Sequence, residues 1–326
     1  MNQREFGRTA WRVGEIGLGC WQFGGDFGPL DEDRVFEILE NAVHSGVNFL
    51  DTADVYGAGL SESLIGRFLK EHSGDLVVAT KLGRGADLFP DRYTREGLRA
   101  ATEASLQRLG VERIDLTQLH CIPTACLREG RVFEWLRELQ AEGKIEHFGA
   151  SVESIDEALL CLEQPGLASM QIIFNIFRQK PIERLFEQAR RKKVALIIRL
   201  PLASGLLSGK FDAATRFDES DHRHYNRDGQ AFNVGETFAG IPFEKAIELA
   251  QSLAPLVPPE MSMAQMALRW ILDHDAVSVV IPGATSAEQV RANVAASKLP
   301  PLDKNIHERF AEIYRSSVRE LIRGPY

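Results

Sequence analysis

Short apolar runs that each end on a polar residue recur along this chain and constrain its fold more than any other feature. Three of the runs end on Asp51, Lys81 and His120. Others are closed by Ser151, Gln171, Arg199 and the turn at 283–286. Helix-like stretches separate most of the runs, and apolar strands that alternate with helices predict a parallel sheet. Polar side chains at the carboxyl ends of such strands are the expected layout of an active site in a β/α barrel.

The stretches between the runs have helical periodicity. In residues 32–45, apolar side chains recur at spacings of three and four, which predicts a helix. The same pattern predicts further helices over 61–71, 94–109, 129–142, 154–163, 181–192, 243–253, 262–273, 286–297 and 304–322. Residues 3–15 predict a hairpin that turns at Gly7. With eight candidate strands, the sequence predicts an α/β fold, a (β/α)8 TIM barrel that spans residues 1–326 as a single domain.

A long interval interrupts this alternation after the seventh strand. About eighty residues separate Arg199 from Val277, where about thirty are usual in the rest of the chain. Residues 211–240 are polar and contain glycine. A long irregular loop in a compact domain is usually functional, often as a lid, and a disordered insertion is the alternative.

Composition excludes several classes of protein. The 326 residues include 46 acidic and 38 basic side chains, and the net charge of −8 argues against general binding of nucleic acid or anionic membranes. The four cysteines lack metal-binding spacing, which favours a reducing cytoplasm. The sequence shows neither a secretory signal nor an apolar run of membrane-spanning length. We expect a cytoplasmic protein, with a monomer as the default state.

Three motifs that suggest nucleotides or metals are incomplete. Gly17-Leu-Gly19 is followed by Gln22 where a Rossmann fingerprint requires a third glycine. The segment 205–210 is one residue too short for a P-loop, although its backbone N–H groups could hold phosphates. His222 and His224 lack a third ligand, so we interpret them as part of a solvated loop and expect no metal site.

One set of strand-end residues has the composition of a proton donor. Asp51, Lys81 and His120 end three successive strands, and Tyr56 lies in the loop above the first of them. Neighbouring strands lie about 4.8 Å apart, so these side chains can converge. A lysine ammonium beside a tyrosine hydroxyl favours the phenolate, and a buried carboxylate keeps the lysine charged. We therefore predict that Asp51, Tyr56, Lys81 and His120 are catalytic.

At these residues the sequence resembles the aldo-keto reductase superfamily. The resemblance runs from about residue 3 to residue 298 and rests on seven motifs in order. They are Gly17-Leu-Gly-Cys-Trp21, Asp51-Thr-Ala-Asp-Val-Tyr-Gly57, Ala79-Thr-Lys81, Asp115-Leu-Thr-Gln-Leu-His120, Gly149-Ala-Ser151, the segment 201–210 and Ile281-Pro-Gly283. Segments 201–210 and 281–293 are most similar to bacterial inositol-catabolism reductases and to potassium-channel beta subunits.

The resemblance implies a barrel that binds NADP(H) and reduces aldehydes or ketones. Tyr56 would protonate the carbonyl oxygen, Lys81 and Asp51 would tune Tyr56, and His120 would orient the carbonyl. The implied cofactor-binding residues are Cys20, Trp21, Asp51, Ser151, Gln171, Arg199, Leu200, Pro201, Leu202, Ser204, Gly205, Leu206, Lys210, Gly283, Thr285, Gln289 and Asn293. Trp21, Phe23, Phe27, Val55 and the 211–240 loop would line the substrate pocket.

The sequence departs from the family pattern at three of these places. Arg199 stands where many members have an aromatic ring, and Val152 replaces a common asparagine. Gln289 stands where many members have an arginine for the ribose phosphate, so the 2′-phosphate would depend on Lys210, with Arg216 or Arg223 as further candidates. The leading interpretation is an NADP(H)-dependent carbonyl reductase. A regulatory subunit that binds the cofactor without turnover is the alternative.

Overall fold

The fold, described by a computed structural model over residues 1–72 and 74–326, is built around a sheet of eight parallel strands. Neighbours in the sheet follow the order of the chain: β3 (Leu18–Gly19), β4 (Phe49–Asp51), β5 (Val77–Leu82), β6 (Ile114–His120), β7 (Ile145–Ser151), β8 (Ser169–Ile173), β9 (Ala195–Arg199) and β10 (Val277–Val280). Parallel bridges from Ile16 to Val280 and from Gly19 to Gly283 join the first strand to the last. The predicted (β/α)8 barrel is therefore confirmed.

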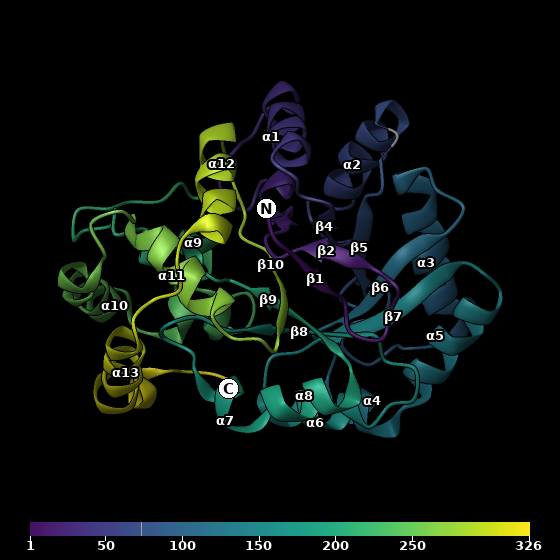
Figure 1. The fold of residues 1–326 in the computed structure, drawn as a ribbon. Helices are drawn as coiled ribbons and strands as arrows, with labels where there is room; N and C mark the ends of the chain where they lie inside the picture. Colours follow the sequence, from purple (N-terminus) through teal and green to yellow (C-terminus); the bar gives the residue numbers. More distant parts are fainter. Residues whose placement is uncertain (73) are drawn as a thin grey trace.

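Helices surround the barrel (Figure 1). They are α1 (Glu32–His44), α2 (Leu60–Glu71), α3 (Arg95–Leu109), α4 (Thr124–Glu129), α5 (Arg131–Ala141), α6 (Ile155–Leu162), α7 (Lys180–Arg184), α8 (Phe186–Lys192), α9 (His222–Tyr225), α10 (Phe243–Ser252), α11 (Met263–Leu272), α12 (Ala287–Ala295) and α13 (Lys304–Ile313). Side chains of Asp31, Thr94, Ser154, Ser262 and Ser286 accept backbone N–H groups at five of the helix starts.

Two expected helices differ from the observed ones. The helix expected over 181–192 is divided between α7 and α8 at Leu185. The helix expected over 304–322 stays α-helical only to Ile313 and continues as a π turn and a 3₁₀ turn to Leu321. Tyr314 and Val318 in that continuation are both buried. The spacing of hydrophobic residues identified the buried face of these helices. It did not distinguish α-helical geometry from π or 3₁₀ geometry.

The N-terminal hairpin closes the amino end of the barrel. Its strands, β1 (Gln3–Glu5) and β2 (Arg12–Gly14), pair antiparallel and lie across the barrel axis in Figure 1. Phe6 and Val13 of the hairpin are fully buried, in a cluster with inward-facing strand residues such as Phe49 and Ile197. Because apolar side chains fill this end, access to the barrel centre comes from the carboxyl ends of the strands.

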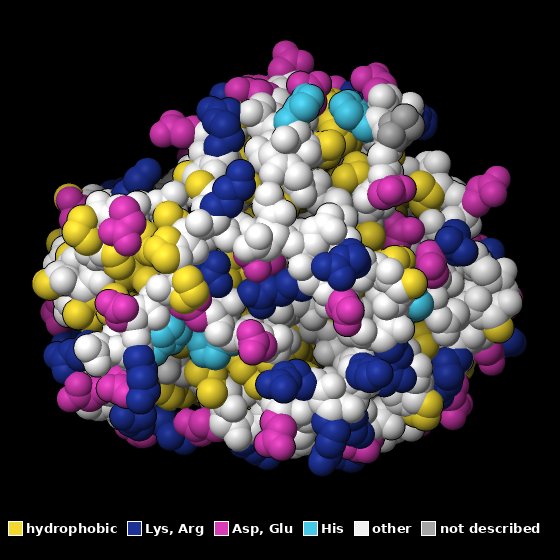
Figure 2. All heavy atoms as spheres, in the orientation of Figure 1, with side chains coloured by type: hydrophobic (Ala, Val, Ile, Leu, Met, Phe, Trp, Pro, Cys, Tyr) yellow, Lys and Arg dark blue, Asp and Glu magenta, His cyan; other side chains and the backbone are white. Residues whose placement is uncertain are grey.

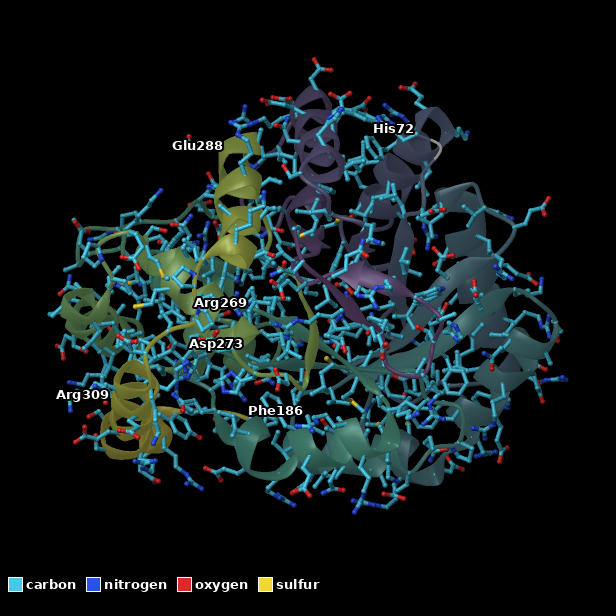
Figure 3. The ribbon with its side chains drawn as sticks, in the orientation of Figure 1. His72, Phe186, Arg269, Asp273, Glu288 and Arg309 are labelled. Carbon is cyan, nitrogen blue, oxygen red and sulfur yellow. The ribbon has the colours of Figure 1, made fainter. Side chains whose placement is uncertain are left out.

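Ion pairs join the hairpin to α11. Glu15 accepts from the Nε of Arg4 at 2.9 Å and lies 3.9 Å from the Nη1 of Arg269. Arg269 also pairs with Asp273 at 2.9 Å, and the two side chains are labelled side by side in Figure 3. These pairs fix α11 relative to the amino end of the barrel.

The segment after β9 is folded over the opposite end. It contains α9, α10, α11 and several short 3₁₀ turns. The backbone N–H of His222 donates to the carbonyl of Asp26 at 2.9 Å, and the hydroxyl of Tyr225 donates to the Asp26 carboxylate at 2.7 Å. Of the two alternatives for residues 211–240, the structure favours an ordered loop over a disordered insertion.

The surface carries both signs of charge. On the face that Figure 2 shows, Lys and Arg side chains are interspersed with Asp and Glu side chains. Among the helices of residues 1–72 and 74–326, none combines the length and the apolar character that a membrane crossing requires.

Candidate active site

A cavity of about 1340 Å³ opens where the barrel strands end. It is lined by strand-end residues that include Gly19, Asp51, His120, Gln171 and Arg199. It extends from these residues to the start of α12. Most of the residues that the sequence singled out line it, namely Cys20, Trp21, Phe27, Asp51, Val55, Tyr56, His120, Gln171, Arg199, Leu200, Pro201, Leu202, Ser204, Gly205, Lys210, Gly283, Thr285, Gln289 and Asn293.

Lys81 joins Asp51 to Tyr56 at the bottom of this cavity. Its ammonium donates to Asp51 Oδ1 at 2.5 Å, to the carbonyl of Thr52 at 2.8 Å and to the Tyr56 hydroxyl at 3.2 Å. Only 1% of the Lys81 side chain is exposed, so it lies behind Tyr56 and does not line the cavity. The adjacent strands β4 and β5 hold Asp51 and Lys81 at this distance. The predicted convergence of these three side chains is confirmed.

Tyr56 keeps its proton in this environment. Burial is the main cause that raises the pKa of Tyr56, to about 12, and the ammonium of Lys81 opposes it. Lys81 lowers the pKa of Tyr56, as the sequence suggested, but burial raises this pKa by more than Lys81 lowers it. Burial lowers the pKa of Lys81 and the Asp51 carboxylate raises it, with a net increase, so Lys81 stays charged. The site therefore holds a protonated phenol beside a permanent cation.

His120 is a neutral imidazole at the end of β6. Burial and the nearby cations Lys81, Arg84 and Arg199 hold its pKa well below its usual value. Its ring lies edge-on to the ring of Tyr56, with 5.8 Å between the centroids. Its Nδ1 is buried, and no residue of the described chain bonds to it. A neutral imidazole can donate one hydrogen bond into the cavity without adding charge.

Two amides hold the second oxygen of Asp51. Gln118 Nε2 donates to Asp51 Oδ2 at 3.1 Å, and Gln171 Nε2 donates to the same oxygen at 2.7 Å. The Ser151 hydroxyl donates to Gln171 Oε1 at 3.3 Å, and Ser151 does not line the cavity. Gln118 was not predicted from the sequence, although a glutamine inside the apolar run before His120 was a usable signal. Every Asp51 oxygen is therefore bonded.

The turn after β9 adopts left-handed backbone conformations at several positions. Leu200, Ala203 and Ser204 have positive φ angles of 51°, 48° and 57°, and Gly205 follows with 96°. The N–H groups of Ala203 and Gly205 donate to the carbonyls of Leu200 and Leu202, each at 3.0 Å, so the turn is closed by its own backbone hydrogen bonds. Leu206 is 1% exposed in the core and does not line the cavity.

The cavity lining also includes a cation and an anion that come from the turn after β9 and from α12. Lys210 lines it from the turn, and no ion pair of Lys210 occurs within the described residues. Glu288 lines it from α12, where Figure 3 labels it. Gln289 folds back, and its Oε1 accepts from the backbone N–H of Thr285 at 2.8 Å. The expected residues are present, and sequence analysis did not single out Glu288.

Aromatic side chains form one wall near Tyr56. Trp21 stacks on Tyr56 with 5.9 Å between the ring centroids, and Phe27 meets Trp21 edge-on at 5.2 Å. Phe232, from the long segment, lies 5.9 Å from Trp21 and adds to this wall. Phe23 is 2% exposed in the hydrophobic core and does not line the cavity, contrary to the prediction.

His222 supports the aromatic wall from behind. It is fully buried, with its ring 4.6 Å from Trp21 and 4.5 Å from Phe27. Its interpretation as part of a solvated loop is wrong, because the turn of α9 points it inward. Arg223 lines the cavity and is held by Asp221, whereas Arg216 bonds to neighbouring backbone carbonyls and does not line it.

Charged side chains form another part of the cavity lining, which we call the charged wall: Arg84, Glu153, Arg199 and Glu236. Glu236 Oε1 lies 3.5 Å from Arg84 and 3.4 Å from Arg199. Arg84 also lies 3.3 Å from Glu153. Only Arg199 was singled out from the sequence. Arg84, three residues after Lys81, could have been found from its strand-end position, but nothing local marked Glu236.

The charged wall includes a group with metal-binding geometry. Ligand atoms of Cys121, Glu153 and Glu236 lie within 4.8 Å of one another. Burial raises the pKa of the Cys121 thiol to about 11, which disfavours the thiolate that binds metals. Arg84 and Arg199 already neutralise both carboxylates. This chemistry does not favour a cation.

Comparison with known proteins identifies relatives over the whole chain. The NADH-specific methylglyoxal reductase of Escherichia coli K12 is 30% identical, with 99% of this chain and 100% of that protein covered. The uncharacterized oxidoreductase YqkF of Bacillus subtilis is 27% identical over 91% of each chain. The holo form of the aldo-keto reductase AKR11C1 from Bacillus halodurans has a TM-score of 0.78 at 27% identity and covers 98% of each chain.

A second solved structure is similar to the same extent. The glycerol dehydrogenase AKR11B4 from Gluconobacter oxydans has a TM-score of 0.78 at 27% identity, over 99% of this chain and 98% of that one. The model of the aldo/keto reductase family matches residues 15–315. These residues contain the whole barrel and every residue of the candidate site described above. The chain belongs to the aldo/keto reductase family of oxidoreductases.

Proposed function

We propose that this protein reduces aldehydes or ketones to alcohols with NADPH, and that Tyr56 is the general acid. The observation that carries the proposal is the Tyr56 hydroxyl, 3.2 Å from the buried ammonium of Lys81 at the bottom of the cavity. Carbonyl reduction requires a proton at the oxygen as hydride reaches the carbon. A phenol that keeps its proton at neutral pH is the correct protonation state for a donor.

The neighbouring residues complete this acid. Lys81 stabilises the phenolate that forms when Tyr56 gives up its proton, and Asp51 keeps Lys81 charged and in place. His120 donates a hydrogen bond to the carbonyl oxygen and so orients it toward Tyr56. The cofactor, when bound, supplies the hydride. Trp21 and Phe27 shield the reacting carbon from water on the aromatic wall.

The remaining cavity fits a nicotinamide dinucleotide. The turn from Leu200 to Gly205 would bind the pyrophosphate, with Pro201, Leu202 and Ser204 in the same turn. Gly283, Thr285 and Asn293 would surround the adenosine half. We propose NADPH because the Lys210 ammonium can pair with a 2′-phosphate, and a charge-assisted contact of this kind contributes about 1.5–3 kcal/mol.

One observation favours NADH as a second candidate. Glu288 lines the cavity at the adenosine end, and carboxylates at such positions bond to the free ribose hydroxyls of NAD.

We expect Lys210→Ala to weaken the binding of NADPH about tenfold or more and that of NADH much less. We expect Gln289→Arg to strengthen the binding of NADPH selectively. Titration of both cofactors by tryptophan fluorescence measures this. Equal losses for the two cofactors in Lys210→Ala would place Lys210 at the pyrophosphate and favour NADH.

A regulatory subunit that binds the cofactor without turnover is the other function class. The complete set of Asp51, Tyr56, Lys81 and His120 beside an open cavity supports the enzyme. The deciding experiment is steady-state oxidation of NADPH and NADH with a panel of carbonyl compounds. Turnover that disappears in Tyr56→Phe supports the reductase. Tight cofactor binding without turnover on any carbonyl would favour the regulatory role.

A further inference from the structure

A buried polar cluster lies outside the cavity, behind the loop that carries Tyr56. Its centre is the first turn of α2, where the side chains of Ser61 and Glu62 are both fully buried. Neither residue lines the cavity. Carboxylates are almost never fully buried unless they are paired. The burial of these two side chains therefore requires a reason in the structure around them.

Ser61 joins the strand ends to the loop of Tyr56. Its hydroxyl accepts from the Thr52 hydroxyl at 2.8 Å and donates to the carbonyl of Cys20 at 2.9 Å. Its backbone N–H donates to the carbonyl of Tyr56 at 3.3 Å. The carbonyl of Thr52 in turn accepts from the ammonium of Lys81 at 2.8 Å. Ser61 therefore contacts both a residue that holds Lys81 and the backbone that carries Tyr56.

Glu62 holds the next strand in a similar way. Its Oε1 accepts from the Thr80 hydroxyl at 2.5 Å, and its Oε2 accepts from the Nε of Arg108 at 2.6 Å. Thr80 is 1% exposed and directly precedes Lys81 in β5. Arg108 belongs to α3, which lies beside α2 (Figure 1). The carboxylate of Glu62 thus bonds to the strand of Lys81 on one side and to a neighbouring helix on the other.

The distance between Lys81 and Tyr56 depends on two separate segments of the chain, β5 and the loop after β4. A backbone hydrogen bond joins the two segments directly, from the N–H of Asp54 to the carbonyl of Lys81 at 3.2 Å. The first turn of α2 adds a second connection, because Ser61 binds the loop and Glu62 binds the strand. Small displacements of reacting groups are costly, since a misplacement of about 1 Å can lower a rate about 10²-fold.

We propose that Ser61 and Glu62 are positioning residues for the proton donor, Tyr56. They fix the loop and the strand from outside the barrel, so that the hydroxyl of Tyr56 stays at hydrogen-bond distance from the ammonium of Lys81. Both act through other residues, since neither lines the cavity. The inference rests on the proposed role of Tyr56 as general acid and adds the residues that hold it in place.

Thr80 offers a test substitution with a matched control on the neighbouring strand. Thr80→Val keeps the shape of the side chain but removes the hydroxyl that bonds to Glu62, whereas Thr80→Ser keeps this hydroxyl. Thr117 pairs with Thr80 in the register of β5 and β6 and is fully buried. Its hydroxyl has no hydrogen bond within the part of the chain that the structure describes. Thr117→Val therefore makes the same change of atoms beside Thr80 without breaking a bond of the cluster.

Reduction of 4-nitrobenzaldehyde, followed by the oxidation of NADPH, gives kcat and KM for each variant. We expect Thr80→Val to lower kcat about tenfold or more while KM for NADPH changes less than about twofold, because the donor is displaced and the cofactor cavity is not. Ser61→Ala, which removes the other connection, should lower kcat in the same way. Thr80→Ser and Thr117→Val should stay near the wild type. Equal kcat in Thr80→Val and Thr117→Val would refute the proposal.

A double-mutant cycle separates positioning from a merely structural role. Tyr56→Phe leaves no hydroxyl to position, so Thr80→Val in that background should lower the residual kcat by less than about twofold. A loss of about tenfold that persists without the hydroxyl would show that Glu62 supports the fold rather than the donor, and would overturn the proposal.

A spectroscopic titration tests the position of Tyr56 without turnover. The chain has five tyrosines. When 3,5-difluorotyrosine replaces them, the fluorine resonance that is absent in Tyr56→Phe belongs to Tyr56. Burial raises the pKa of Tyr56 and the ammonium of Lys81 lowers it, so a displaced donor should titrate at a pH about 0.5 or more higher in Thr80→Val than in the wild type or Thr117→Val.

This titration also separates the inference from the proposed reaction. If no carbonyl compound oxidises NADPH or NADH, the proposed reduction fails, yet the higher titration pH in Thr80→Val would still support the positioning role. Identical titrations of the Tyr56 resonance in the wild type, Thr80→Val and Thr117→Val would refute that role.

Discussion

Replacement of Lys81 by methionine tests the electrostatic design of the site most directly. Lys81 and Asp51 are only 1% and 4% exposed at their side chains and lie 2.5 Å apart. Methionine fills the same space without the ammonium, so the carboxylate of Asp51 keeps the two amide bonds from Gln118 and Gln171 but loses its counter-ion. Removal of one partner from a buried ion pair costs about 3–5 kcal/mol. We expect a loss of that size in the free energy of unfolding at pH 7.5.

The loss should depend on pH with a definite sign. Without Lys81, burial raises the folded-state pKa of Asp51 above its unfolded value of about 4. The folded variant then binds the proton more tightly than the unfolded chain, so its stability falls as pH rises above about 4. The defect should therefore be small near pH 4.5 and large near pH 8. Urea denaturation followed by circular dichroism across this range measures it.

The double variant Asp51→Asn with Lys81→Met is the matched control. It removes both charges and keeps the side-chain volumes, and neutral replacements of buried ion pairs are often tolerated. We expect it to recover most of the lost stability while it stays inactive. If Lys81→Met loses less than about 1 kcal/mol, or if the double variant is no more stable than the single one, the charge of Asp51 does not depend on Lys81 and the reasoning is refuted.

Three further substitutions follow from the structure. Tyr56→Phe should lower kcat by about 10²-fold or more with cofactor affinity almost unchanged, and wild-type turnover would remove Tyr56 from the mechanism. Burial and nearby Glu62 raise the pKa of Asp54 to about 7, so Asp54→Asn should add about 1–2 kcal/mol of stability at pH 8 and none at pH 4, measured by urea denaturation. Gly66→Ala should destabilise α2 by about 1–3 kcal/mol, because a Cβ there would lie 2.4 Å from the carbonyl oxygen of Arg108; a gain in thermal midpoint would contradict this contact.

Local patterns in the sequence were sufficient to predict the barrel and the residues that converge at the carboxyl ends of its strands. Apolar runs closed by Asp51, Lys81 and His120 mark strand ends. Because the strands of a barrel are parallel, their carboxyl ends lie at the same end of the barrel. Helix boundaries were within a few residues where a capping side chain stood at the start, as at Thr94 and Ser154. These features depend on neighbours in the chain or on adjacent strands.

The geometry of the helix ends and the close contacts between helices could be determined only from the structure. Gly66 shows why: helix propensity alone favours alanine there by about 1 kcal/mol, but the approach of α3 leaves no room for a Cβ. Phe23 and Leu206 lie beside cavity-lining residues in sequence but point into the core. Which way a side chain points from an irregular turn depends on the packing around it, and no periodic pattern encodes that.

The charged wall of the cavity was decided by tertiary structure alone. Glu236 reaches Arg84 and Arg199 from a short 3₁₀ turn, Val234–Glu236, so its position depends on how the whole segment after β9 folds over the barrel. The buried position of His222 against Trp21 could not be predicted from the sequence for the same reason. Sequence by itself determined the barrel and the convergence of Asp51, Lys81 and Tyr56, because both follow from repeated short-range spacing. The charged wall exists only because the folded chain brings residues that are distant in sequence into contact. The entropy that is lost when such contacts form is offset by the fold as a whole.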